Sequence, residues 1–273
     1  MIRLAETADA LRPLCGSAFG CPILSAAAAY GFSRPFAQFW TDGAAAYGML
    51  DGVMRIAGTV ADPEEARAFL GAVGAAQVVC SAENGARLGL RVTARGAVLE
   101  KALSGTAASP AEPVPVRAVY DVLAANDMAG EFEPFYLDLS HRLRHGAARA
   151  SVLYAGGEAV AAAVAALAGE SALVTAVAVL PAWQNKGYGG AVLRAVEEQL
   201  GGRRAYLLRA EHENERFYAR RGYVPCGAWC AGVWNKGNDD CGSCAALCRV
   251  GPQGKGAPAA RGRRKTVCMS FLR

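Results

Sequence analysis

The stretch VAVLPAWQNKGYGGAVLRAVEEQL, residues 177–200, joins a strand to a helix through a glycine-rich loop. The strand ends near Pro181, and apolar residues recur at helical spacing from Val192 to Leu200. A helix start leaves backbone N–H groups unpaired and carries partial positive charge, and glycines let an anion approach the backbone. We therefore expect the loop Gln184–Gly190 to bind a phosphate or a pyrophosphate.

The loop on its own does not decide between a binding site and a tight turn that happens to precede a helix. Lys186 adds a formal positive charge, which favours an anion. The spacing matches neither the G-x-x-x-x-G-K-[ST] loop of nucleotide hydrolases nor the G-x-G-x-x-G loop of dinucleotide-binding folds. The choice therefore depends on residues further along the chain.

A second motif, FYARRGY at residues 217–223, follows the next predicted strand. Together the two motifs resemble the GNAT superfamily of acyl-CoA-dependent N-acyltransferases. The family loop Q/R-x-x-G-x-G/A is matched by Gln184, Gly187 and Gly189, and the later F-Y-x-x-x-G-F/Y signature by Phe217, Tyr218, Gly222 and Tyr223. The resemblance covers roughly 110 residues, from Val114 to Pro225.

The resemblance implies acetyl-CoA as the co-substrate and direct attack of an amine on the thioester. The pyrophosphate would sit on loop amides, and the pantetheine arm would hydrogen-bond along the preceding strand, whose N–H near Val179 would steady the oxyanion. Tyr218 matches the position of the acid that protonates the leaving thiolate. The implied cofactor-contacting residues are Val177, Ala178, Val179, Gln184, Asn185, Lys186, Gly187, Tyr188, Gly189, Gly190 and Asn214.

The chain departs from the family pattern in its other polar residues. The family asparagine stands seven residues before the tyrosine, where this chain has Glu211, whereas Asn214 stands four before it. Asn214 contacts the cofactor or caps a short helix, and Glu211 relays a proton or forms a surface salt bridge. The strand Leu173–Val177 carries no carboxylate to act as a base. Tyr218 itself has core packing as its alternative role.

The chain divides into two segments with a similar order of elements. We expect an amino-terminal domain at 1–103, a linker at 104–113, a GNAT domain at 114–226 and a disordered basic, cysteine-containing tail at 227–273. Both segments run from a helical start through a three-strand meander, a helix and a strand. This predicts an α/β (α+β) protein with two tandem GNAT-like copies, each a mixed, mostly antiparallel sheet flanked by helices.

The first copy is expected to be degenerate. Its meander, residues 39–59, turns at Asp42-Gly43 and Asp51-Gly52, and a helix follows with Asp62 as its N-cap and Gly74 at its end. No glycine loop precedes this helix, and Asp62, Glu64 and Glu65 would repel pyrophosphate. We also expect a short helix capped by Thr7, a strand at 76–80 and another at 88–93.

Composition and charge exclude several classes of protein. Residues 227–273 hold eight Lys or Arg and two Asp, a net charge of +6, so the rest of the chain carries −1 and offers no body-wide nucleic-acid surface. The stretch around 159–183, interrupted only by Glu170, is interpreted as two buried strands rather than a membrane span. The start lacks the apolar region of a secretory signal, which predicts a cytoplasmic protein with mostly free thiols.

Metal binding is not expected, although two patterns suggest it. Cys241-x-x-Cys244 invites a zinc interpretation, with Cys226 and Cys230 as a loosely fitting second pair. His141 and His145 are spaced to share a helix face, which is interpreted as solvated or lining a groove.

The predicted function is transfer of an acetyl group to a small-molecule or protein amine. The main alternative is a non-catalytic acyl-CoA-binding or sensing module that keeps the loop but lacks a base. A nucleic-acid-associated role for the basic tail is a third hypothesis, and association into a homodimer stays open.

Overall fold

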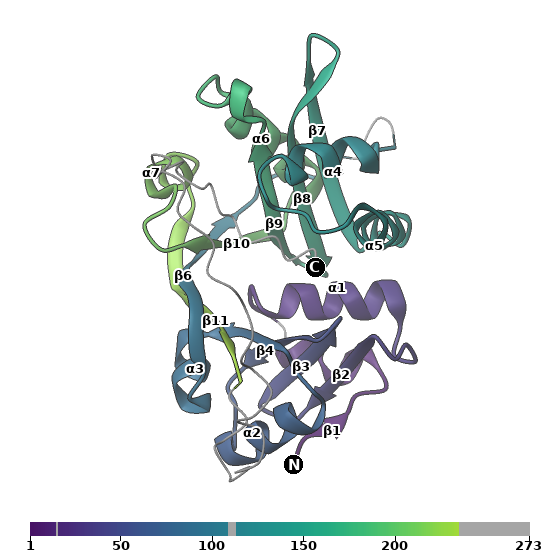
Figure 1. Ribbon diagram of the computed structural model, residues 1–273, viewed down its shortest axis with the longest axis vertical. Coiled ribbons are helices and arrows are strands. Elements are labelled where there is room, and N and C mark those ends of the chain that lie inside the picture. The colour runs from purple at the N-terminus through teal and green to yellow at the C-terminus, as the bar shows by residue number, and fades with distance from the viewer. Residues whose placement is uncertain (15, 109–112, 235–273) are drawn as a thin grey trace, which may run out of the picture.

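One mixed sheet of eleven strands runs through the protein, in the order β1-β2-β3-β4-β5-β11-β6-β10-β9-β8-β7. The computed structural model describes residues 1–14, 16–108 and 113–234, and Figure 1 shows two lobes connected by this sheet. We call the part from β1 to β6 the first half, and the part from α4 to β11 the second half.

The first half carries a meander, a helix and two further strands. Its elements are β1 (Arg3–Leu4), the 3-10 helices at Ala8–Ala10 and Arg12–Leu14, α1 (Gly20–Tyr30), β2 (Ala37–Thr41), β3 (Ala45–Leu50), β4 (Val53–Gly58), α2 (Pro63–Ala72), β5 (Gln77–Ser81), α3 (Ala82–Leu88) and β6 (Arg91–Ala102). The meander and its two Asp-Gly turns confirm the sequence prediction. Asp62 caps α2 as predicted, because its side chain accepts hydrogen bonds from the amides of Glu64 and Glu65.

The second half repeats this order after two helices. Its elements are α4 (Val116–Ala124), α5 (Phe132–Arg144), β7 (Ala148–Ala155), β8 (Glu158–Ala168), β9 (Ser171–Val179), a 3-10 turn (Pro181–Trp183), α6 (Tyr188–Leu200), β10 (Arg204–Ala210), α7 (Glu215–Ala219) and β11 (Val224–Val233). In each half the third meander strand pairs in parallel with the strand after the helix, β4 with β5 and β9 with β10. The fold is therefore two GNAT-like copies in tandem, as expected.

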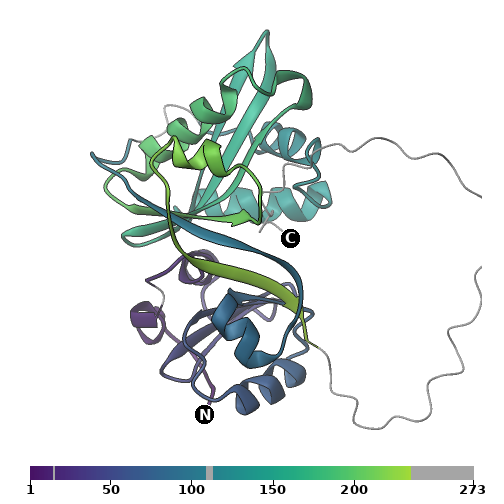
Figure 2. The ribbon, with the colours of Figure 1, turned by 90° about the vertical axis from the view of Figure 1, so that its left-hand side faces the viewer.

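The two copies exchange their last strands. β5 pairs with β11 of the second half, β10 pairs with β6 of the first half, and β6 and β11 pair with each other, all antiparallel. Figure 2 shows these two long strands running side by side between the lobes. The sequence boundary at 103 therefore does not separate two self-contained domains.

The predicted tail began too early. β11 extends to Val233, seven residues past the predicted end of the domain at 226. Trp229, Cys230 and Ala231 are buried and pair with Ser81, Cys80 and Val79 of β5, which removes this segment from solvent. Residues 235–273, with Cys241 and Cys244, lie outside the described residues.

Sequence reasoning missed two helices and mistyped a third. α1 and α3 were not predicted, and two 3-10 helices replace the single helix expected after Thr7, whose side chain makes no cap hydrogen bond. α1 contacts β8 of the second half as well as β2, β3 and β4 of the first, so it lies between the two lobes in Figure 1. Burial on both sides removes the amphipathic pattern that identifies a helix in a sequence.

Two cores flank the second half of the sheet. Alternate residues of β8 point to opposite faces. Ala161, Ala163 and Ala165 pack against Val192 and Leu193 of α6, whereas Ala162 and Val164 pack under α4 and α5. The stretch around 159–183 thus forms two buried strands, β8 and β9, with Glu170 between them. No described helix is long and apolar enough to cross a membrane.

Candidate active site

The sheet opens between β9 and β10. Their parallel ladder runs from Ser171 opposite Arg204 to Val174 opposite Leu207, and then the strands part. The parting coincides with a bulge at Thr175, where the register with β8 shifts and the Thr175 hydroxyl donates to the carbonyl of Val164 at 3.2 Å. Beyond the bulge, Ala176–Val179 pairs with β8 alone, so its other edge presents backbone groups to an extended ligand.

The loop after β9 brings an uncapped helix start to the same opening. Gly187 is the N-cap of α6 with φ of 91°, and no side chain caps the helix. Asn185 also has a positive φ, 61°, while the Gln184 side chain donates to the carbonyl of Val179 at 3.3 Å. The amides of the first turn have no carbonyl one turn earlier to bond with, so they can bind an anion.

These features share one cleft of about 450 Å³. The lining residues are Val177, Val179, Gln184, Asn185, Gly187, Gly189, Gly190, Asn214, Phe217, Tyr218, Arg220 and Arg221. Nine of the thirteen predicted site residues are in this set. Ala178 is on the opposite face of β9, beneath α4 and α5. Lys186 lies over the Trp183 ring at 4.8 Å, and Tyr188 packs edge-on against that ring.

A family model described as acetyltransferase (GNAT) domain matches residues 147–225 of the chain. That segment contains the opened strand, the loop, α6 and Tyr218. It is a GNAT acetyltransferase domain.

Solved structures extend the likeness over both halves. A GCN5-related N-acetyltransferase from Sphaerobacter thermophilus is 17% identical with a TM-score of 0.55, covering 85% of this chain and 94% of its own. A GCN5-related N-acetyltransferase from Kribbella flavida is also 17% identical, with a TM-score of 0.50, covering 71% of this chain and 88% of its own. At these identities the likeness concerns the fold. No curated protein matches the sequence.

Tyr218 of the GNAT domain is buried at the back of the cleft, with 3% of its surface exposed. It is held by α7, where its amide donates to the carbonyl of Asn214, and by edge-on contacts with Phe217 and Tyr223. Asn214 lines the cleft at the start of α7, and its side chain makes no cap hydrogen bond. Of its two predicted roles, the capping hydrogen bond is not formed, and contact with a ligand stays a prediction.

Glu211 is not brought into the cleft of the GNAT domain. Its exposed carboxylate forms an ion pair with Arg95 of β6 at 2.8 Å. The hydrogen bond from Arg95 lowers the pKa of Glu211, so the carboxylate becomes a poorer proton acceptor. The structure thus favours the salt-bridge role over the proton relay, because the strand exchange places Arg95 beside the end of β10.

Three residues that line the cleft were not predicted as site residues. Arg220 and Arg221 line the GNAT cleft beside Phe217, a residue of the second motif. The signal was present as adjacent arginines before Gly222, but both residues follow the end of α7 at Ala219, and only tertiary packing brings them beside the loop. No Asp, Glu or His is among the described lining residues, so the cleft has a cationic character.

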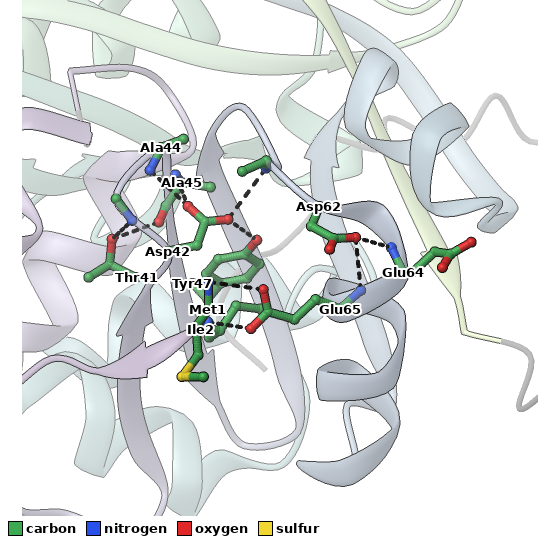
Figure 3. Close-up of polar contacts among 12 residues, drawn as sticks. Met1, Ile2, Thr41, Asp42, Ala44, Ala45, Tyr47, Asp62, Glu64 and Glu65 are labelled. Carbon is green, nitrogen blue, oxygen red and sulfur yellow. Dashed lines mark hydrogen bonds and ion pairs between the residues drawn. The ribbon is translucent and has the colours of Figure 1, made fainter.

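The corresponding region of the first half is closed by its own side chains. Figure 3 shows Asp62 bonded to the amides of Glu64 and Glu65, at 2.9 and 3.1 Å, in the first turn of α2. The side-chain amide of Asn84 donates to the carbonyl of Gly58 at 2.9 Å and accepts from the amide of Val60 at 3.1 Å. Backbone groups that remain available in the GNAT cleft are therefore already satisfied here.

The histidines and cysteines of the two metal-binding patterns contact protein groups where the structure describes them. His141 stacks on Tyr30 of α1 at 4.8 Å, with its Nε2 2.8 Å from the carbonyl of Ala29. Cys230 is buried, with its sulfur 4.0 Å from that of Cys80, whereas Cys226 is exposed. Among the described residues no three His, Cys, Asp or Glu side chains gather as metal ligands do.

Proposed function

We propose that the cleft binds acetyl-CoA or a related acyl-CoA and transfers the acyl group to an amine. The observation that carries this is the meeting of an opened strand edge and an uncapped helix start in one cleft. The diphosphate would bind the amides between Asn185 and Gly190, and the pantetheine arm would lie along Val177–Val179. The acceptor is a small-molecule or protein amine.

The chemistry assigned to the cleft is a direct transfer. The amine nitrogen attacks the thioester carbonyl, the C–N bond forms, and the C–S bond breaks. A backbone N–H near Val179 would stabilise the oxyanion, and the Tyr218 hydroxyl would give its proton to the leaving thiolate. Because no carboxylate or imidazole is among the described lining residues, the amine would lose its proton to solvent.

Tyr218→Phe tests the assigned acid. We expect turnover with an accepted amine to fall roughly 100-fold or more, the usual contribution of a positioned acid. The affinity for CoA, measured by isothermal titration calorimetry, should stay within about threefold of wild type, because no binding contact is assigned to the hydroxyl. A variant with wild-type turnover across a pH series would remove Tyr218 from the mechanism.

A second candidate is a non-catalytic module that binds or senses acyl-CoA. It is favoured by the lack of a carboxylate or imidazole in the described lining. Incubating the full chain with acetyl-CoA and a library of amines separates the two candidates. Binding of CoA without release of free thiol for any amine would support the sensor, and no binding of CoA or its thioesters at all would end both.

A further inference from the structure

The side chain of Arg221 is fixed on the wall of the cleft. Its guanidinium carbon lies 3.9 Å from the centre of the Phe217 ring, and its Nη1 donates to the carbonyl of Phe217 at 3.2 Å. Phe217 in turn lies against Gly189, where an added Cβ would be 3.5 Å from the ring. The cation is therefore held by stacking and by a hydrogen bond.

Gly190 makes room for this guanidinium at the start of α6. A Cβ on Gly190 would lie 1.7 Å from Nη2 of Arg221, so a side chain there would displace the arginine. Nε of Arg221 is buried and has no hydrogen-bond partner among the described residues. A planar cation with an unpaired donor thus lies directly against Gly190 in the first helical turn, whose amides the anion would bind.

We infer that Arg221 is the charged partner of these amides in a diphosphate site, and that it makes the cleft selective for nucleotide-bearing thioesters. A guanidinium can bond two phosphate oxygens at once, with more directional hydrogen bonding than an ammonium group. No acidic residue among the described lining competes for it. Acyl-pantetheine, which lacks the diphosphate, gains nothing from this contact. The inference rests on the proposed function.

Calorimetry on the full chain tests it with CoA and pantetheine as the two ligands. Arg221→Leu should lower the affinity for CoA roughly 10- to 100-fold, as expected for the loss of a hydrogen bond to a charged group. It should lower the affinity for pantetheine by less than about threefold. Arg216→Leu is the matched control, because Arg216 is an exposed residue of α7 outside the cleft lining. It makes the same charge change and should alter CoA affinity by less than about threefold.

A second pair of variants tests the position of the side chain. Gly190→Ala should displace Arg221, so the double variant with Arg221→Leu should lose no more CoA affinity than the weaker-binding single variant. The inference is overturned if wild type binds CoA and Arg221→Leu binds it equally well. It is also overturned if Arg221→Leu lowers the affinities for CoA and for pantetheine by the same factor. A loss of CoA affinity in Arg216→Leu as large as that in Arg221→Leu would overturn it too. Wild type that binds no CoA would instead remove the proposed function.

Discussion

The first turns of α2 and α6 occupy equivalent places in the two halves, yet only one is open. In the first half the Asp62 carboxylate bonds two first-turn amides. In the second half the N-cap is Gly187, and none of the described side chains caps the helix. A capping carboxylate satisfies first-turn amides internally, because it supplies the charge that a bound anion would otherwise bring.

The strand edges differ in the same way. Asn84 of α3 bonds the carbonyl of Gly58 and the amide of Val60 at the end of β4, so the opening between β4 and β5 is bridged. In the second half Asn214 starts the short helix α7 instead, and its side chain lines the cleft. The same kind of residue therefore closes one opening and lines an open cleft in the other.

The largest effect is expected from giving the second half the N-cap of the first. Gly187→Asp should weaken CoA binding at least roughly 100-fold, or about 2.7 kcal/mol, because its carboxylate would occupy the amides and repel a diphosphate. Gly187→Asn is the matched control, with similar size and tolerance of positive φ but no charge. Calorimetry with CoA gives both affinities.

Gly187→Asn should lose clearly less CoA affinity than Gly187→Asp. Equal losses of CoA affinity would mean that the contrast between Gly187 and Asp62 is not one of charge, and that backbone conformation or capping by a neutral side chain accounts for it.

A smaller effect is expected from opening the bridged edge of the first half. Asn84→Ala leaves the Gly58 carbonyl and the Val60 amide without their partner, and should lower the free energy of unfolding by about 1–3 kcal/mol. Its counterpart Asn214 has a left-handed backbone with φ of 53°, which glycine tolerates. Asn214→Gly should therefore cost less than about 0.5 kcal/mol, since the residue is exposed and its side chain makes no cap hydrogen bond. Urea unfolding followed by circular dichroism measures both, and equal costs would contradict the bridging role.

Features with local signals were predictable from the sequence. Asp62-Pro63-Glu64 predicts the cap of α2, and the glycines predict the loop before α6. Both helix starts could therefore be predicted from a few neighbouring residues. The nine predicted residues that line the cleft come from the strand–loop–helix and from α7, whose motifs are contiguous.

Features that depend on distant parts of the chain were not predictable. The exchange of β6 and β11 leaves each strand with an ordinary antiparallel pattern, and only its partner changes. The role of Glu211 was undecided until Arg95, more than a hundred residues away, was seen beside it. The position of Arg221 on the cleft wall depends on its packing against Gly190 of α6, which is distant in the sequence.

The smallest effect concerns Asp42, which ties the meander of the first half to the loop before α2. Its carboxylate accepts hydrogen bonds from the amides of Ala44, Ala45 and Ala61 and from the hydroxyl of Tyr47, as Figure 3 shows for the labelled groups. Burial alone would raise the pKa of Asp42, but these hydrogen bonds outweigh it and lower the pKa below the usual 3.8. The unfolded chain therefore takes up this proton at higher pH than the folded chain does.

Stability contributed by Asp42 is thus complete above its unfolded pKa and is lost as pH falls through the lower folded pKa. At neutral pH, Asp42→Asn should be less stable than wild type in urea unfolding, and the difference should narrow as the pH is taken below 3.8. Tyr47→Phe removes one donor and should keep part of the pH dependence. If the difference in unfolding free energy between wild type and Asp42→Asn stays constant as the pH falls, this carboxylate does not hold the loop. Closure of the first half would then rest on Asp62 and Asn84.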